Sequence, residues 1–147
     1  MNDVGGTQAK DVATAGQAMF SLLKAAESLE ERLATAFGTV GLSLPKFSVL
    51  AELVRAGEPL PLATIASRLS CVRSNVTQLI DRLEKDGMVK RIDDPNDRRS
   101  VRAALTPFGR DRQAAGAEQL DQITKEFAER LSEDDRAAIE RLAAKIG

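Results

Sequence analysis

The side chains best suited to chemistry in this sequence lie on one face of an amphipathic helix predicted over residues 72–86. This face presents arginine, amide and hydroxyl groups, the short and forked side chains that can hydrogen-bond to base edges in a DNA major groove. The opposite face is apolar at the i, i+4, i+7 and i+8 positions, as expected of a helix lying on a core. Taken alone, the polar face fits an ordinary solvated surface better, so the surrounding elements must decide its role. The exposed residues are Arg73, Ser74, Asn75, Thr77, Gln78 and Arg82.

The chemistry of these side chains predicts a division of roles. Arg73 has the forked guanidinium that pairs with guanine, and the amides of Asn75 and Gln78 match adenine. Ser74 and Thr77 carry short hydroxyls that are better suited to phosphate oxygens. All five lie in the first two turns of the predicted helix, the end that enters the groove in helix-turn-helix docking.

A second group of candidates lies in a β-hairpin predicted after this helix. Strands over residues 88–92 and 101–105 flank a charged, turn-rich loop in which Arg98 and Arg99 are adjacent. Two arginines at a hairpin tip are long enough to enter a minor groove narrowed by A·T tracts. Such a loop alone is a common surface turn, and its position after the helix favours the DNA interpretation. Weaker candidates, for phosphates near the hairpin, are Lys90, Arg91 and Arg102.

The elements that position both groups follow the order helix, turn, helix, strand, loop, strand over residues 60–105. A short support helix is predicted from Leu62 to Leu69. Gly87 ends the second helix, because glycine accepts the left-handed C-cap conformation. A recognition helix followed by a basic hairpin is typical of a winged helix-turn-helix, and in this context DNA recognition is favoured over a plain solvated face.

Long helical patterns flank this region on both sides. Apolar residues at helical spacing predict helices over residues 11–37 and 108–130, and a last helix follows Ser132. Ser43 is expected to cap a further helix within the central region. Residues 1–10 show no periodicity and are predicted to form a disordered tail. The length of 147 residues predicts a single domain.

Five blocks of the sequence resemble the MarR (multiple antibiotic resistance regulator) family of transcription factors. Their order and spacing are specific, although any one block alone is weak, and the resemblance extends over roughly residues 15–147. It implies a mostly α fold with a small β-hairpin wing. In that fold a winged helix-turn-helix over residues 43–105 is flanked by dimerisation helices over residues 11–37 and 107–147. The blocks are GLSLPKFSVL (41–50), IASRL (65–69), SNVTQLIDRLEKDG (74–87), DPNDRRS (94–100) and LTPFGR (105–110).

The resemblance also implies a function and a mode of assembly. The chain is expected to be a transcriptional regulator, a repressor, that binds a pseudo-palindromic site on double-stranded DNA as a homodimer. Asp97 is expected to orient Arg99, the favoured side chain for insertion into the groove. In many members of the family a small aromatic acid or phenol releases the DNA from a pocket between the dimer helices and the winged helix. Apolar candidates for the lining of such a pocket, which fit a plain core equally well, are Met19, Leu22, Leu23, Phe47 and Phe108.

The distribution of charge indicates a local rather than a general attraction to nucleic acid. The net charge is −1, yet residues 68–110 hold ten Lys or Arg against six acids, a local net charge of +4. Positive charge concentrated near the predicted recognition surface attracts DNA phosphates there, while the rest of the protein does not bind nucleic acid non-specifically. The main rival interpretation is a winged-helix protein-interaction module, which this local charge and the paired arginines disfavour.

Composition argues against an enzyme and against a membrane protein. The sequence has no histidine and one cysteine, which excludes an imidazole base, a zinc cluster and an internal disulfide, so no catalytic residue, metal or cofactor is predicted. No apolar run reaches the 18 or so residues of a membrane span, and a reducing, cytoplasmic location is expected. Cys71 leaves one alternative open, a DNA-binding redox sensor, although a small apolar role in the turn is favoured.

Overall fold

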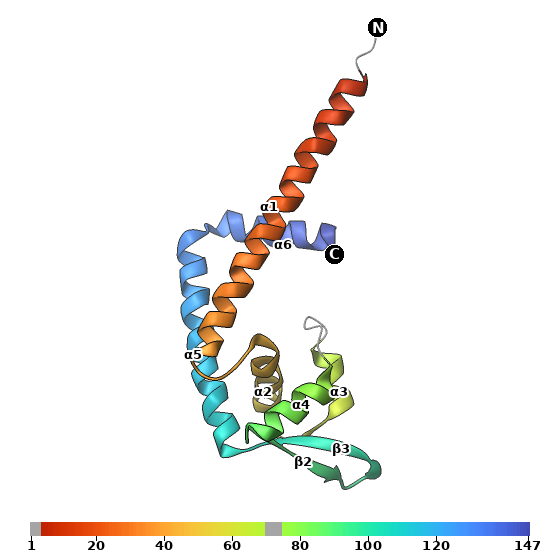
Figure 1. Ribbon diagram of the computed structural model, residues 1–147, viewed down its shortest axis with the longest axis vertical. Helices are drawn as coiled ribbons and strands as arrows, with labels where there is room; N and C mark the ends of the chain where they lie inside the picture. Colours follow the sequence, from red (N-terminus) through yellow and green to blue (C-terminus); the bar gives the residue numbers. More distant parts are fainter. Residues whose placement is uncertain (1–3, 70–74) are drawn as a thin grey trace.

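The computed structural model describes residues 4–69 and 75–147 as a mostly helical chain with a small antiparallel sheet, which confirms the predicted fold class. The head, which comprises α2 to α4 and the sheet, lies at the bottom of Figure 1. Helices α1 and α5 rise from it side by side. The elements are α1 (Val4–Gly38), α2 (Leu44–Ala56), β1 (Leu60–Pro61), α3 (Leu62–Arg68), α4 (Val76–Lys85), β2 (Val89–Asp94), β3 (Asp97–Leu105), α5 (Pro107–Arg130) and α6 (Glu133–Ile146).

The core of the head joins its three helices to the sheet. Phe37 at the end of α1 stacks on Phe47 of α2, with ring centroids 4.9 Å apart, so α1 is anchored where it enters the head. Ile80 and Leu83 of α4 are fully buried, and the opposite face of this helix therefore points to solvent. The largest fully buried side chains are Phe37, Val49, Leu50, Ile65, Ile80, Leu83 and Val89.

Capping side chains set where three of the helices begin. The hydroxyls of Ser43, Thr106 and Ser132 each accept the backbone N–H three residues further on, at 3.3, 3.0 and 3.1 Å respectively. Each bond satisfies one of the N–H groups that a first helical turn leaves without a partner. The predicted cap at Ser43 and the predicted helix after Ser132 are confirmed.

Helix α1 begins earlier than the sequence suggests. Residues 4–10 belong to the predicted disordered tail over residues 1–10, but they are helical and continue into the helix predicted over residues 11–37, which corrects that prediction for them. Most of the cost of a helix lies in its nucleation, so an existing helix can extend through Gln8, Ala9 and Lys10 without an apolar period, whereas Gly5 and Gly6 each oppose the extension by about 1 kcal/mol relative to alanine. Residues 1–3 lie outside the described residues.

The wing, defined here as β2, β3 and the turn between them, has longer strands than predicted. The turn comprises only Pro95 and Asn96, so most of the predicted loop over residues 93–100 is strand. Arg98 and Arg99 accordingly lie at the start of β3, just after the tip. Hydrogen bonds of the ladder outweigh the low strand propensity of this polar segment, an effect that composition does not reveal.

The sheet contains a third strand that the sequence does not predict. Its order is β1–β3–β2, and β1 pairs antiparallel with β3 through Leu60 opposite Ala103 and Pro61 opposite Arg102. Two residues are too few to show an alternating pattern, so residue spacing cannot indicate this strand. Proline is tolerated there because β1 is an edge strand.

Helix α4 begins at Val76, four residues later than predicted. Asn75 precedes it in an extended conformation, with φ −70° and ψ 107°. The prediction of an earlier start rests on Val72, which is apolar and shares the helical spacing of Val76. Residues 70–74, to which most of this predicted first turn belongs, lie outside the described residues.

The fold leaves apolar side chains on α1 and α6 exposed. Helix α6 has no buried residue, and Phe20 on α1 is 67% exposed. In Figure 1 the N-terminal half of α1 projects away from the head. None of the helices in the described ranges is both long and apolar enough to cross a membrane. The exposed apolar residues of the two helices are Val12, Met19, Phe20, Leu22, Leu23, Ile139, Leu142 and Ile146.

We expect Gly109→Ala to destabilise the junction between the head and α5. A Cβ at Gly109 would lie 1.9 Å from the carbonyl oxygen of Met88, so the backbone of α5 or of the turn must shift. Overpacking of this kind lowers the free energy of unfolding in urea by about 1–3 kcal/mol. The control is Gly16→Ala, where nothing lies within 4 Å of the added Cβ. Alanine inside a helix is about 0.5–1 kcal/mol more favourable than glycine. Wild-type stability of Gly109→Ala would contradict the close approach of the two backbones.

Candidate nucleic-acid interface

Helix α4 turns a polar face to solvent. Thr77, Gln78 and Arg82 are exposed, while the apolar face of the helix packs into the core of the head. Gln78 and Arg82 are four residues apart and therefore neighbours along the helix surface. Of the six residues predicted for DNA recognition on this helix, the structure thus places three on its exposed face.

Asn75 is the N-cap of this helix as well as a predicted base contact. Its Oδ1 accepts the backbone N–H of Gln78 at 3.3 Å. Bidentate recognition of adenine uses both the oxygen and the nitrogen of an amide, and capping competes for the oxygen. Gln78, whose side chain lies on the exposed face one turn along, is therefore the better placed of the two amides for that contact.

Several predicted residues fall in the segment outside the described residues. Arg73 and Ser74, predicted to contact guanine and phosphate, belong to it, and so does Cys71. Their roles stay predictions. Within residues 4–69 and 75–147, no three His, Cys, Asp or Glu side chains are grouped so that they could hold a metal ion.

The wing presents two exposed arginines directly after its turn. Arg98 and Arg99 project from the first residues of β3. Asp97 Oδ1 accepts the backbone N–H of Arg99 at 3.0 Å, so Asp97 orders the backbone from which Arg99 projects. Asp94 Oδ1 accepts the N–H of Asn96 at 2.9 Å in the same way. These local side-chain turns stabilise a tip that has only two residues.

Arg102 is engaged within the wing. Its Nη2 lies 3.3 Å from Asp94 Oδ1, and its side chain is 26% exposed. Its Nε is buried and has no hydrogen-bond partner among the described residues. Among the three weaker phosphate candidates on the wing, Lys90 is exposed, whereas Arg102 would have to leave Asp94 to reach DNA.

The carboxylate of Asp94 connects the turn of the wing to β3. The backbone N–H of Asn96, and with it the guanidinium of Arg102, hold the pKa of Asp94 below its ordinary value of 3.8. Hydrogen bonding and an opposite charge both favour the ionised form of a carboxyl group. Asp94 is therefore ionised at neutral pH while it holds both partners.

Arg91 lies on β2 against α4. Its guanidinium pairs with Asp81 and, at 3.0 Å, with Glu84 Oε1, and its backbone N–H donates to Glu84 Oε2 at 2.9 Å. Asp81, and then Glu84, raise the pKa of Arg91 above its ordinary value. Arg91 is also one of the weaker phosphate candidates, but two carboxylates already occupy its guanidinium.

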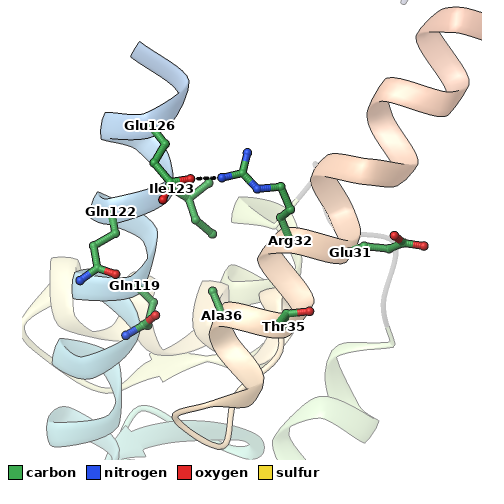
Figure 2. A pocket seen from close by; sticks show the side chains of 8 residues that line it. All are labelled: Glu31, Arg32, Thr35, Ala36, Gln119, Gln122, Ile123 and Glu126. Atoms are coloured by element: carbon green, nitrogen blue, oxygen red, sulfur yellow. Dashed lines mark hydrogen bonds and ion pairs between the residues drawn. The ribbon is translucent and has the colours of Figure 1, made fainter. Parts of the chain in front are cut away.

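A hollow of about 430 Å³ lies between α1 and α5. Figure 2 shows the ion pair between Arg32 of α1 and Glu126 of α5 that spans it. Gln119, Gln122 and Ile123 line the side formed by α5. The lining is mixed, with one cation, carboxylates and amides around a small apolar surface.

The five residues predicted to line a ligand pocket are not gathered in one place within the chain. Phe47 is buried in the core of the head, whereas Phe108 is half-exposed at the start of α5 beneath the guanidinium of Arg112, 5.6 Å from the ring centroid. None of the five lines the hollow between α1 and α5. The other three, on α1 and exposed, are Met19, Leu22 and Leu23.

The sequence does not reveal the ion pairs that join the elements of the head. Its pattern places Asp81 on a solvated helix face, yet Asp81 contacts Arg91 ten residues later. Lys46 of α2 lies 2.8 Å from Asp86 at the end of α4, and nothing in the sequence indicates that pair. Such contacts depend on the angle between elements, which residue spacing does not encode.

Known proteins resemble this chain in sequence and in fold. A model of the MarR family matches residues 42–101. The uncharacterized HTH-type transcriptional regulator YkoM of Bacillus subtilis is 41% identical over 92 residues, 63% of this chain and 54% of that protein, so the chain spans about half of its length. The multiple antibiotic resistance protein MarR of Salmonella typhimurium is 33% identical over 110 residues, 71% of this chain and 73% of that protein.

The fold has a close counterpart among solved structures. The structure of a MarR family transcriptional regulator from Streptomyces coelicolor in complex with DNA superposes with a TM-score of 0.80 at 24% identity. The superposition covers 91% of this chain and 86% of that chain. The head and the long helices are therefore shared together, rather than the head alone.

We expect the wing to lose stability in acid through Asp94. Because the pKa of Asp94 is lower in the folded chain, its contribution is fully present above the unfolded value of about 3.8 and disappears as the pH falls through the folded value. Asp94→Asn should therefore be less stable than wild type near neutral pH and should show a smaller loss of stability on acidification. Urea unfolding across this pH range measures both effects. Asp93→Asn controls for the loss of one acidic charge, and parallel pH profiles for wild type and Asp94→Asn would contradict the assignment.

Proposed function

The chain belongs to the MarR family, and we propose that it binds double-stranded DNA as a cytoplasmic homodimer and represses transcription by occluding a promoter. Its relatives are transcriptional regulators, which are not enzymes. The observation that carries the proposal is the exposed polar face of α4 followed by a wing with two exposed arginines. Both lie in a region of the sequence with a marked positive charge, a net of +4 over residues 68–110.

In the proposed complex α4 enters the major groove with its N-terminal end. Gln78 reads a base edge, Thr77 binds phosphate, and Arg82 contacts the backbone further along the groove. The wing lies along the adjacent minor groove, where Arg99 is inserted with Arg98 beside it. Lys90, exposed on β2, contacts a phosphate.

The proposed dimer forms through α1 and α6 together with α5. The exposed apolar side chains of α1 and α6 form patches that a monomeric protein rarely leaves in water, and a second copy would cover them. A two-fold axis relates the two heads, so the site on DNA is pseudo-palindromic. The two α4 helices enter successive major grooves about one helical turn apart.

A small aromatic acid or phenol is the proposed effector, by analogy with the family. The hollow between α1 and α5 supports a site near the helices that set the distance between the heads. There an acidic group of the ligand would replace Glu126 as the partner of Arg32, and Ile123 offers an apolar surface. A ligand that binds better to a dimer with mismatched head spacing shifts the population away from the DNA-binding form.

Two other functions are not favoured. A winged-helix module that binds only proteins would not need the exposed arginines of the wing, and the relatives are regulators of transcription. A redox sensor would depend on Cys71, which lies outside the described residues. No observation on residues 4–69 or 75–147 supports either of these functions.

We expect Arg99→Ala to weaken operator binding by about 1–3 kcal/mol and to leave the protein folded and dimeric. Removing a cation from the groove should also make the dependence of affinity on salt shallower, by about 0.9 in the logarithmic slope for each phosphate that the variant no longer neutralises. Fluorescence anisotropy with a labelled operator across a salt series measures both quantities. The control is Arg130→Ala, which removes an exposed arginine at the far end of α5. Unchanged affinity in Arg99→Ala would remove the wing from the interface.

We expect Leu23→Glu to dissociate the dimer. Leu23 of α1 is 57% exposed, and a carboxylate placed in an apolar interface without a partner is strongly unfavourable. Sedimentation velocity should show a dimeric wild type and a monomeric variant. Gln17→Glu adds the same charge at an exposed polar position of the same helix and should stay dimeric. A monomeric wild type, or a dimeric Leu23→Glu, would contradict the proposed interface.

A further inference from the structure

Three charged side chains, Asp81, Glu84 and Arg91, form a cluster that joins α4 to the wing and is called here the α4–wing clamp. Asp81 and Glu84 are three residues apart on α4, so both carboxylates project from one side of the helix. Arg91 on β2 pairs with both of them. Opposite charges from two elements are thereby brought together on the surface of the head.

Glu84 holds the backbone of β2 as well as a side chain. Its Oε2 accepts the N–H of Arg91 at 2.9 Å, and its Oε1 accepts Nη1 of the same residue at 3.0 Å. A side-chain pair alone could follow a moving strand by changing rotamer. A bond to the main chain cannot, because the position of the N–H is the position of β2 itself.

The clamp acts on the part of β2 that the core of the head no longer holds against α4. Buried Met88 and Val89 fix the base of β2 next to the end of α4. Beyond this base the wing extends away from the core, and its tip residues are exposed. Arg91 lies two residues beyond Val89 and contacts α4, so it opposes rotation of the wing about the turn.

The charge of Arg91 is not free to contact DNA. A phosphate would have to draw the guanidinium away from two carboxylates, and these would then face the backbone of DNA as like charges. The side chains of the clamp are 27–55% exposed, and exposed ion pairs contribute little to the free energy of unfolding. Orientation of the wing, rather than stability or phosphate binding, is the role that fits these observations.

We propose that Arg91 is a positioning residue, which with Asp81 and Glu84 fixes the distance and angle between the DNA-reading face of α4 and the arginines of the wing. The protein thereby selects the spacing between a major-groove sequence and the A·T-rich minor groove beside it. This inference rests on the proposed DNA binding.

The test compares two duplexes that carry the selected operator. In the second duplex one base pair is inserted in each half-site, between the sequence that α4 contacts and the sequence that the wing contacts. The distance between the two α4 sequences stays unchanged. Wild type should bind the altered duplex about tenfold more weakly, the cost of a misplaced contact. Arg91→Met should bind both duplexes within about twofold of each other, because a loosened wing adapts to either spacing, and should keep the salt slope of wild type.

Lys90→Met is the matched control, since it removes the same charge from the adjacent, exposed residue of β2. It should retain the spacing preference and show a shallower salt slope. Glu84→Ala is a second variant, which keeps Arg91 but removes both acceptors that Glu84 offers to it, and it should also lose the preference. If Arg91→Met instead keeps the spacing preference of wild type, Arg91 has no part in positioning. If it shows the shallower salt slope of Lys90→Met, Arg91 is a phosphate contact.

A measurement without DNA separates failure of the clamp from failure of the proposed function. Amide hydrogen exchange over β2 should be faster in Arg91→Met than in wild type and unchanged in Lys90→Met, because only the former removes the side-chain pairs that join β2 to Asp81 and Glu84. Equal exchange in all three proteins would overturn the clamp. A wild type that binds no duplex would contradict the proposed function, while the exchange rates would still decide whether the clamp exists.

Discussion

The turn between α4 and β2 is the constraint on which the arrangement of the molecule depends. Met88 O accepts the backbone N–H of Thr106 at 3.1 Å, and Thr106 Oγ1 donates to Gly87 O at 2.6 Å, so α5 begins on this turn. Lys46 of α2 pairs with Asp86, the first residue of this turn, with 2.8 Å between Nζ and Oδ2. Helices α2, α4 and α5 and strand β2 therefore meet within three residues. The approach of α5 is so close that its first turn contains a glycine in contact with the Met88 carbonyl.

This junction connects the long helices outside the head to the elements that are proposed to contact DNA. Helix α5 runs from the turn to the contact with α1, where Glu126 pairs with Arg32. Packed elements shift as units, because a close-packed interior does not absorb small displacements locally. In the proposed mechanism, a change in the angle between α1 and α5 is passed to α4 through the turn and from α4 to the wing through Arg91. The proposed dimer, effector site and DNA interface are connected by this one route.

Local chemistry determines the parts of the fold that the sequence predicts. Apolar spacing identifies the helices, Ser43 marks a cap, Gly87 marks the end of α4, and the charged turn marks the hairpin that carries Arg98 and Arg99. Prediction fails for β1, which exists only because β3 is beside it. The start of α4 is also misplaced, because Asn75, which the sequence predicts to lie inside the helix, is its N-cap. In the candidate site the exposed residues of α4 and the wing are predictable from their types. The partners of Arg91 and Arg102 are not, because they depend on how α4, β2 and β3 are arranged in space.

The most direct test of a symmetric DNA-binding dimer is selection of bound duplexes from a random pool by the purified, dimeric protein, with the affinity of the enriched sequence followed across salt concentrations. Two heads that read DNA together should select an inverted repeat with half-sites about ten base pairs apart, and affinity should fall steeply with salt. The half-sites should carry A·T-rich sequence where the wings lie. Failure to enrich any sequence with folded dimer, or enrichment of a single unpaired half-site, would contradict a symmetric dimer whose two heads read DNA together.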